Sequence, residues 1–147
     1  MNKLTLVAVL LILTATLHFG ADLFGIYQEQ IESGFVWFDN VLHFVTGITT
    51  GIFWFWVLEK YRPQASPKYR VVSTILVVLG VALGWELFEF LFLKLFAPYA
   101  MSLQMYSTSV GEATADALSN LLGAVVLITS INLWRRKNGV GDIKGNS

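Results

Sequence analysis

Long hydrophobic runs alternate with short polar links along the whole chain. A helix that crosses the hydrocarbon core of a bilayer needs about 20 consecutive apolar residues, and four runs are long enough. The spans expected from this pattern are residues 4–21, 38–59, 71–96 and 111–134. We therefore predict an all-α fold, a four-transmembrane-helix bundle that forms a single domain over residues 1–137, followed by a disordered tail at 138–147.

The first run has some features of a cleaved signal peptide. Lys3 precedes an apolar stretch that ends near the small residues Gly20 and Ala21. The same stretch is long enough to span a membrane, which a typical leader is not. We therefore expect a retained first helix rather than a removed leader.

Basic residues are distributed asymmetrically among the links. Nine of the ten Lys and Arg residues precede the first span, lie between the second and third, or follow the fourth. Lys94 is the exception, and its stem can reach the headgroups from the far end of the third span. Because basic links favour the cytoplasmic side, both termini are predicted to be cytoplasmic. The outer links, 22–38 and 97–111, mix apolar, aromatic and polar residues and are expected to lie against the membrane surface.

The overall composition agrees with a membrane protein and excludes several other classes. Hydrophobic residues make up 55% of the chain, and the mean hydropathy is +0.62. The formal net charge is zero, so nothing indicates nucleic-acid binding. The absence of cysteine excludes disulfides and thiolate metal ligands.

Two pairs of glycines at four-residue spacing mark faces where helices can approach closely. They are Gly47 with Gly51 and Gly80 with Gly84. Either pair could also support a homo-oligomer. At about 100° per residue, the second pair lies roughly opposite Glu86 and Glu89 on the same helix.

Each expected span carries a stripe of polar residues at helical spacing. With a rise of 1.5 Å per residue, the ionisable groups all fall within roughly 15 Å of the predicted outer surface. The stripes contain Thr14, His18 and Asp22; Asp39, His43, Thr46 and Thr50; Glu86 and Glu89; and Glu112, Asp116, Ser119 and Gly123. We expect them to converge in one outward-facing cavity, whose candidate binding residues are His18, Asp39, His43, Glu86, Glu89, Glu112, Asp116 and Asn120.

A purely structural role is the alternative for these polar groups. Polar side chains in membrane helices often only hydrogen-bond neighbouring helices, which contributes about 0.6–2 kcal/mol each. That role is expected for the threonines and Ser119, and Asp22, Asp39 and Glu112 are close enough to the surface to be solvated. An acidic residue at mid-helix costs about 2.5–3.5 kcal/mol. Four residues are therefore better explained by function: His43, Glu86, Glu89 and Asp116.

The sign of the charge narrows what the cavity could hold. Apart from Lys94, no Lys or Arg lies near these carboxylates in the expected topology. Carboxylates crowded without cations must be protonated, hydrated or bound to a metal. One divalent cation is a possible cofactor, with candidate ligands His43, Glu86, Glu89 and Asp116. No spacing matches an established metal signature, so a metal-free site stays open.

Three motifs carry a resemblance to known families. They are "FDNVLHFVTG" (38–47), "GWELFEF" (84–90) and "GEATADALSNLLGA" (111–124). Together they resemble the YjdF-like small bacterial inner-membrane proteins and, more widely, the VanZ-like proteins. Asn40 stands where the YjdF-like pattern has arginine, and Glu112 where it has aspartate. The resemblance implies a role in the cell envelope, in the bacterial cytoplasmic membrane.

Three classes of function fit these features. The first is a binding or accessory membrane protein whose outward-facing cavity holds a cation, lipid headgroup or amphiphile. The second is a membrane-embedded, metal-dependent hydrolase or transferase acting on a lipid-linked envelope substrate. The third is a proton- or cation-coupled carrier. The inner half of the bundle contains no charged residue that could pass an ion across the membrane, which argues against a carrier. No nucleophile is paired with a base at a recognisable spacing, which argues against an enzyme. The binding class is therefore favoured, with membrane lipid as the expected partner, and whether the protein is an enzyme stays open.

Overall fold

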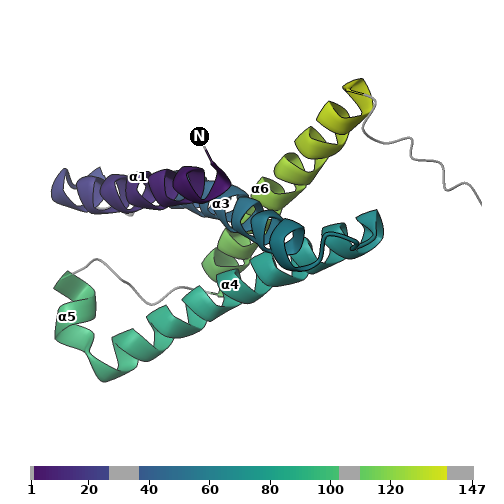
Figure 1. Cartoon of the computed structure of the whole chain (residues 1–147). Coiled ribbons are helices and arrows are strands. Elements are labelled where there is room, and N and C mark those ends of the chain that lie inside the picture. Colours follow the sequence, from purple (N-terminus) through teal and green to yellow (C-terminus); the bar gives the residue numbers. More distant parts are fainter. Residues whose placement is uncertain (1, 27–36, 103–109, 139–147) are drawn as a thin grey trace, which may run out of the picture.

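The computed structural model describes residues 2–26, 37–102 and 110–138, and all of this part is organised around helices. The order is α1 (Lys3–Leu23), α3 (Trp37–Tyr61), α4 (Pro67–Leu95), the short α5 (Ala97–Ser102) and α6 (Val110–Lys137) (Figure 1). The four long helices are each long and apolar enough to cross a membrane. The all-α, four-helix fold predicted from hydropathy is therefore confirmed.

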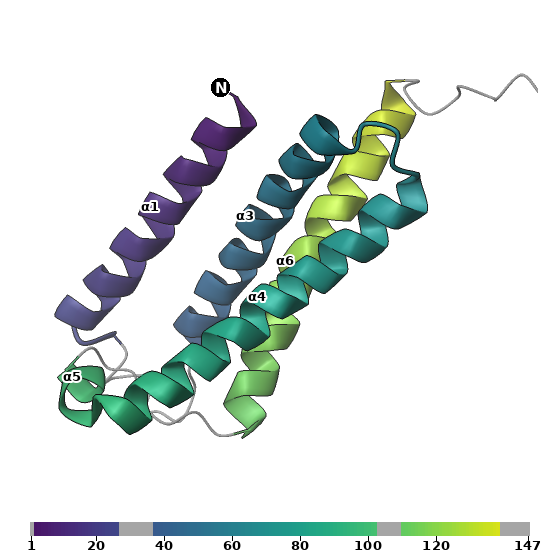
Figure 2. The ribbon, with the colours of Figure 1, turned by 60° about the horizontal axis from the view of Figure 1, so that its bottom comes forward.

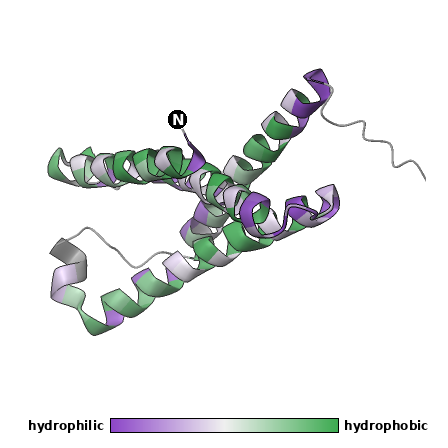
Figure 3. Ribbon diagram, viewed as in Figure 1, coloured by the Kyte–Doolittle hydropathy of each residue, from purple (hydrophilic) through white to green (hydrophobic). Residues whose placement is uncertain are grey.

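The four long helices run alternately up and down, so the helix ends form two groups on opposite sides of the bundle. Figure 2 shows the start of α1, the α3–α4 turn and the end of α6 at one side, and the opposite helix ends at the other. Hydrophobic residues cover most of the length of each helix, and hydrophilic residues gather at the α3–α4 turn and the end of α6 (Figure 3). This distribution is the one that a bilayer requires of a spanning bundle.

The turn between α3 and α4 is fixed by side chains, and α4 begins earlier than residue 71. The hydroxyl of Ser66 accepts a hydrogen bond from the backbone N–H of Tyr69 at 3.2 Å, and Pro67 occupies the first turn of the helix. The buried Arg70 donates to the carbonyl oxygens of Ala65 (3.0 Å) and Pro63 (2.8 Å). Pro67 therefore initiates α4 instead of belonging to the link.

The closest helix pair is α3 with α6, which touch backbone to backbone. A Cβ atom added at Gly47 would lie 2.0 Å from the carbonyl oxygen of Asn120, and one at Gly123 would lie 2.2 Å from that of Phe44. Gly51 also faces α6, where a Cβ would lie 2.6 Å from a methyl carbon of Leu127. Only glycine permits this approach. The Gly47/Gly51 pair is thus used inside the chain.

The second glycine pair lies on an open face. At Gly80 and Gly84 an added Cβ would meet no described atom within 4 Å. Both glycines are exposed on α4. A homo-oligomer through the Gly80/Gly84 face stays a prediction, whereas one through Gly47 and Gly51 would first have to displace α6.

Helix α1 is held against α3 at both of its ends. Near its start, Lys3 pairs with Glu59 of α3. Near its end, Ala21 and Leu42 are buried together, with Phe38 packed against them. Helix α1 has no comparable packing against α4, and both ribbon views show the two helices apart (Figures 1 and 2).

Several sequence-based expectations lie outside the described residues. They concern the surface position of the link segments 27–36 and 103–109, and the disorder of the tail beyond residue 138. The side chain of Asp22 is also outside the described part. These expectations stay predictions.

Membrane orientation can be tested by cysteine labelling, because the chain has no native cysteine. Gln64 lies in the exposed α3–α4 turn, at the end of the bundle that carries Lys3, and Tyr99 is exposed on α5 at the other end. With both termini cytoplasmic, a membrane-impermeant maleimide added to intact cells should label Tyr99→Cys and not Gln64→Cys. The reverse labelling pattern would show that the termini are on the outer side and would contradict the predicted topology.

Candidate functional site

The α3–α6 contact brings two polar pairs together near the start of both helices. Asp39 and His43 lie one turn apart on α3, and Asp116 and Asn120 lie one turn apart on α6. The glycine contact at Gly47 places Asn120 against the α3 backbone, so these pairs face each other across the interface. Asp116 and Asn120 are almost fully buried there, with 4% and 2% of their surfaces exposed.

His43 lies between the two aspartates. Its Nε2 atom is 3.8 Å from Oδ2 of Asp39 and 3.8 Å from Oδ1 of Asp116. One ligand atom from each of the three residues lies within 4.8 Å of the other two. We call Asp39, His43 and Asp116 the acidic–histidine cluster. Its donor set, two carboxylates and one imidazole, suits either a divalent metal or a positively charged organic group.

Asn120 determines which imidazole nitrogen carries the proton. Its Nδ2 atom donates to the backbone carbonyl of Asp116 at 2.9 Å, which fixes the direction of the amide. The same Nδ2 lies 2.9 Å from Nδ1 of His43. Nδ1 therefore accepts, and the proton of a neutral imidazole is on Nε2. The cluster thus presents an N–H group between two carboxylates.

A second polar contact fixes the same interface. The hydroxyl of Ser119 donates to Oδ1 of Asn40 at 2.9 Å. Asn40 is the position at which the YjdF-like pattern has arginine. In this chain the Asn40 side chain links α3 to α6 through Ser119, and it contributes no positive charge to the site.

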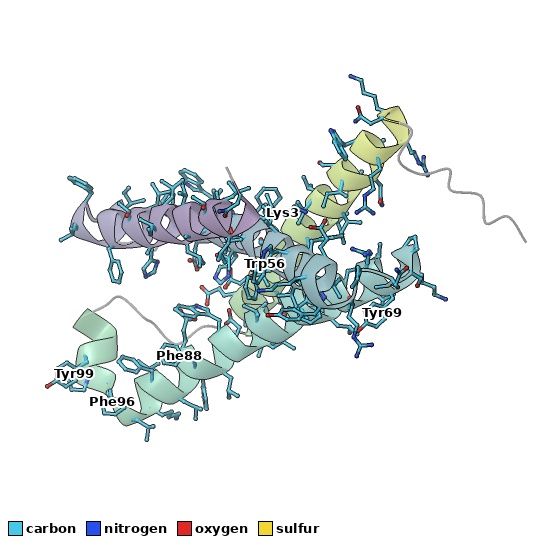
Figure 4. The ribbon with its side chains drawn as sticks, viewed as in Figure 1. Lys3, Trp56, Tyr69, Phe88, Phe96 and Tyr99 are labelled. Atoms are coloured by element: carbon cyan, nitrogen blue, oxygen red, sulfur yellow. The ribbon has the colours of Figure 1, made fainter. Side chains whose placement is uncertain are left out.

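A cavity of about 480 Å³ lies beside the cluster, lined by α1, α3 and α4 with one residue of α6. Most of its wall is apolar and comes from α1 and α4. Figure 4 shows Phe88 projecting from α4 toward the side on which α1 lies. The polar lining residues are Thr14, His18, Asp39, His43, Thr46, Glu89 and Asn120. The volume is in the range of small-molecule sites, and the few polar groups gather near the cluster.

The structure places five of the eight predicted cavity residues in the wall of the cavity and the other three outside it. Five line the cavity: His18, Asp39, His43, Glu89 and Asn120. Asp116 lies against His43 at the helix interface. Glu86 and Glu112 are not lining residues, and Glu112 is exposed at the start of α6.

Of the four predicted metal ligands, the structure groups only His43 and Asp116. The third member of that group is Asp39, in place of Glu86 and Glu89, among the residues that the structure describes. Glu86 lies close enough to Asp39 and Asp116 to interact with them electrostatically. One of its carboxylate oxygens, Oε2, is buried and has no hydrogen-bond partner in the described structure.

An aromatic wall on α4 was missed by the sequence analysis. The rings of Trp85 and Phe88 are 5.5 Å apart, as are those of Phe88 and Phe92, and all three line the cavity. Glu89 lies one helical turn from Trp85 and lines the same cavity. The signal was present in the sequence, because spacings of three and four residues place aromatic side chains on one helix face.

A comparison with protein families gives a match over almost the whole chain. Residues 2–137 match the model of a family described as "Predicted membrane protein (DUF2238)". The match includes all four spanning helices and the three motifs of the site. Neither the curated proteins nor the solved structures contain a match to the chain.

Proposed function

The chain belongs to the DUF2238 family of predicted membrane proteins, and we propose that it is a binding protein that holds a cationic ligand in its intramembrane cavity. The observation that carries this proposal is the position of the acidic–histidine cluster at the edge of a largely apolar cavity. Such a site combines a hydrophobic enclosure with a small number of polar groups that orient a ligand.

The charge of the cavity supports a cation over an anion. Asp39 and Glu89 line it, and no Lys or Arg does so in the described part of the chain. Ionised carboxylates within a membrane need a partner charge to offset their desolvation. A phosphate or sulfate headgroup would add repulsion, whereas a cation or a cationic headgroup would supply the missing charge.

We further propose that the site faces outward from the bacterial cytoplasmic membrane and has an accessory role in the cell envelope. The resemblance to YjdF-like and VanZ-like proteins supports that role. The orientation rests on the basic residues, since Lys60, Arg62 and Arg136 lie at the end of the bundle opposite the cluster.

The proposal predicts stabilisation by cations that depends on Asp39. Purified protein should show a saturable rise in Tm with tetramethylammonium or a divalent metal chloride, above that with NaCl at equal ionic strength. A ligand at 100 times its Kd contributes about 2.7 kcal/mol to the free energy of unfolding. Asp39→Asn should weaken binding by at least tenfold.

Glu59→Gln is the matched control, since Glu59 is a carboxylate on the same helix but pairs with Lys3 at the other end of the bundle. It should retain the full cation response. If no cation raises the Tm above NaCl, or if Asp39→Asn responds like the wild type, the proposal is wrong.

A metal-dependent hydrolase or transferase is the second candidate, favoured by the 4.8 Å grouping of the three ligand atoms. Binding of a metal at Nε2 of His43 would require that nitrogen to lose its proton, and the amide of Asn120 would have to turn over so that Nδ1 could donate. The carbonyl contact of Asn120 would then be lost. Elemental analysis of protein purified without chelator tests this candidate, because an enzyme of this class should contain about one metal ion per chain, and a metal-free protein would count against it.

A further inference from the structure

We propose that the cation is an organic ammonium group attached to a hydrocarbon tail, so that the ligand is an ammonium amphiphile. This inference rests on the proposed function and specifies its ligand. It follows from three features of the cavity: an aromatic wall, carboxylates on two helices, and an apolar extension between α1 and α4. A bare metal ion would leave the first and the third unused.

The aromatic wall provides the recognition that ammonium groups favour. Trp85, Phe88 and Phe92 line the cavity with consecutive ring contacts. The faces of such rings attract organic cations, Trp most strongly, and quaternary ammonium ligands are commonly held in this way. An inorganic divalent ion requires oxygen or nitrogen ligands instead, and these rings offer none.

The carboxylates complement the wall. Glu89 lies one helical turn from Trp85 on α4, and both side chains line the cavity, so a carboxylate is placed beside the aromatic surface. Asp39 contributes a second carboxylate to the same cavity from α3. A cation in this space would therefore meet rings and carboxylates together, in a setting where little water competes with the interaction.

The remaining wall fits a hydrocarbon chain. Leu11 and Ala15 of α1 and Val81 of α4 line the cavity away from the charged groups. Because α1 packs on α3 and not appreciably on α4, the cavity lies between two helices that do not close against each other. In a bilayer this gap faces lipid. A volume of about 480 Å³ is also far more than one metal ion would fill.

Photolabelling in lipid nanodiscs tests the inference. Two probes share a dodecyl tail with a diazirine and differ only in the head, trimethylammonium or sulfate. In phosphatidylglycerol nanodiscs, the ammonium probe should label Leu11, Ala15 and Val81 at least tenfold more than the sulfate probe does. Leu87 and Phe90, which are exposed on α4 and do not line the cavity, should be labelled equally by both.

Variants on α4 provide the matched comparison. Trp85→Leu should lower cavity labelling by the ammonium probe at least fivefold, while Phe90→Leu should leave it unchanged. Phe88→Leu is the second variant, used if Trp85→Leu does not give a folded protein by size-exclusion chromatography. Competition with added phosphatidylcholine distinguishes the source of the ammonium: loss of labelling points to a membrane lipid headgroup, and unchanged labelling points to a free amphiphile.

The outcomes separate this inference from the proposed function. Equal cavity labelling by both probes, in a protein that tetramethylammonium or a divalent metal still stabilises through Asp39, would overturn the amphiphile and leave the cation site standing. Equal labelling with no cation response would overturn both. Preferential labelling that survives Trp85→Leu and Phe88→Leu unchanged would contradict the role of the aromatic wall.

Discussion

Gly47→Ala is expected to destabilise the protein severely. The added methyl group would lie 2.0 Å from the backbone carbonyl oxygen of Asn120, and a backbone atom cannot rotate out of the way as a side chain can. The helices α3 and α6 would have to separate. Overpacking of a core typically costs about 1–3 kcal/mol, and we expect a loss at or above the upper end of that range. Thermal unfolding of the purified protein in detergent measures it.

Gly80→Ala is the control for this substitution. It makes the same chemical change in a neighbouring helix, at a position where an added Cβ meets no described atom within 4 Å. We expect its Tm to equal or slightly exceed that of the wild type, because alanine favours helix by about 0.5–1 kcal/mol over glycine. If both variants unfold at the same temperature, the close α3–α6 contact does not hold the site together.

Asp116→Asn is expected to have opposite effects on stability and on binding. Asp116 is buried near four other carboxylates, those of Asp39, Glu86, Glu89 and Glu112. Removal of its charge should relieve repulsion and raise the free energy of unfolding of the ligand-free protein by about 1 kcal/mol. The same change should weaken cation binding at least tenfold. Thermal unfolding with and without tetramethylammonium measures both effects.

Glu112→Gln is the matched control on the same helix. Glu112 is exposed, so its neutralisation should change the free energy of unfolding by less than about 0.5 kcal/mol and leave cation binding intact. A ligand-free Asp116→Asn protein that is less stable than the wild type and binds cations normally would show that Asp116 only supports the fold.

Hydropathy was sufficient to predict the four helices, but not all of their boundaries. The apolar run of the third span begins near residue 71, whereas α4 begins at Pro67. The earlier start depends on a polar cap, Ser66, and on the buried Arg70, neither of which contributes to an apolar run. Capping signals would have located this end better than hydropathy does.

The candidate site could be predicted only in part, because a helical projection fixes each side chain relative to its own axis alone. The spacing of Asp39 with His43 correctly places both on one face of α3. Which face of α3 meets which face of α6 is set by Gly47 and Gly123, and a helical wheel does not contain that information. For the same reason Glu86 was predicted as a candidate metal ligand, whereas the candidate ligand atoms that lie within 4.8 Å of one another in the described structure belong to Asp39, His43 and Asp116.

The cavity between α1 and α4 also could not be predicted from the sequence. Apart from the stripe of Thr14, His18 and Asp22, the first span is apolar, and this pattern does not indicate which helices it packs against. In the structure it packs on α3, with Lys3 paired to Glu59 at one end and Ala21 buried at the other. The cavity is a consequence of this one-sided attachment.

The central claim is that a cation binds in the cavity beside His43 and the carboxylate of Asp39, and nitrogen-15 NMR of the imidazole rings tests it most directly. The chain has two histidines, so a His18→Gln variant assigns the spectrum. In the ligand-free protein, His43 should be the tautomer with a proton on Nε2, because Asn120 donates to Nδ1. Added tetramethylammonium should shift both nitrogen signals of His43 saturably, and Asp39→Asn should abolish the shift. Signals of His43 that do not move with any cation, at concentrations that saturate the Tm response, would contradict the account.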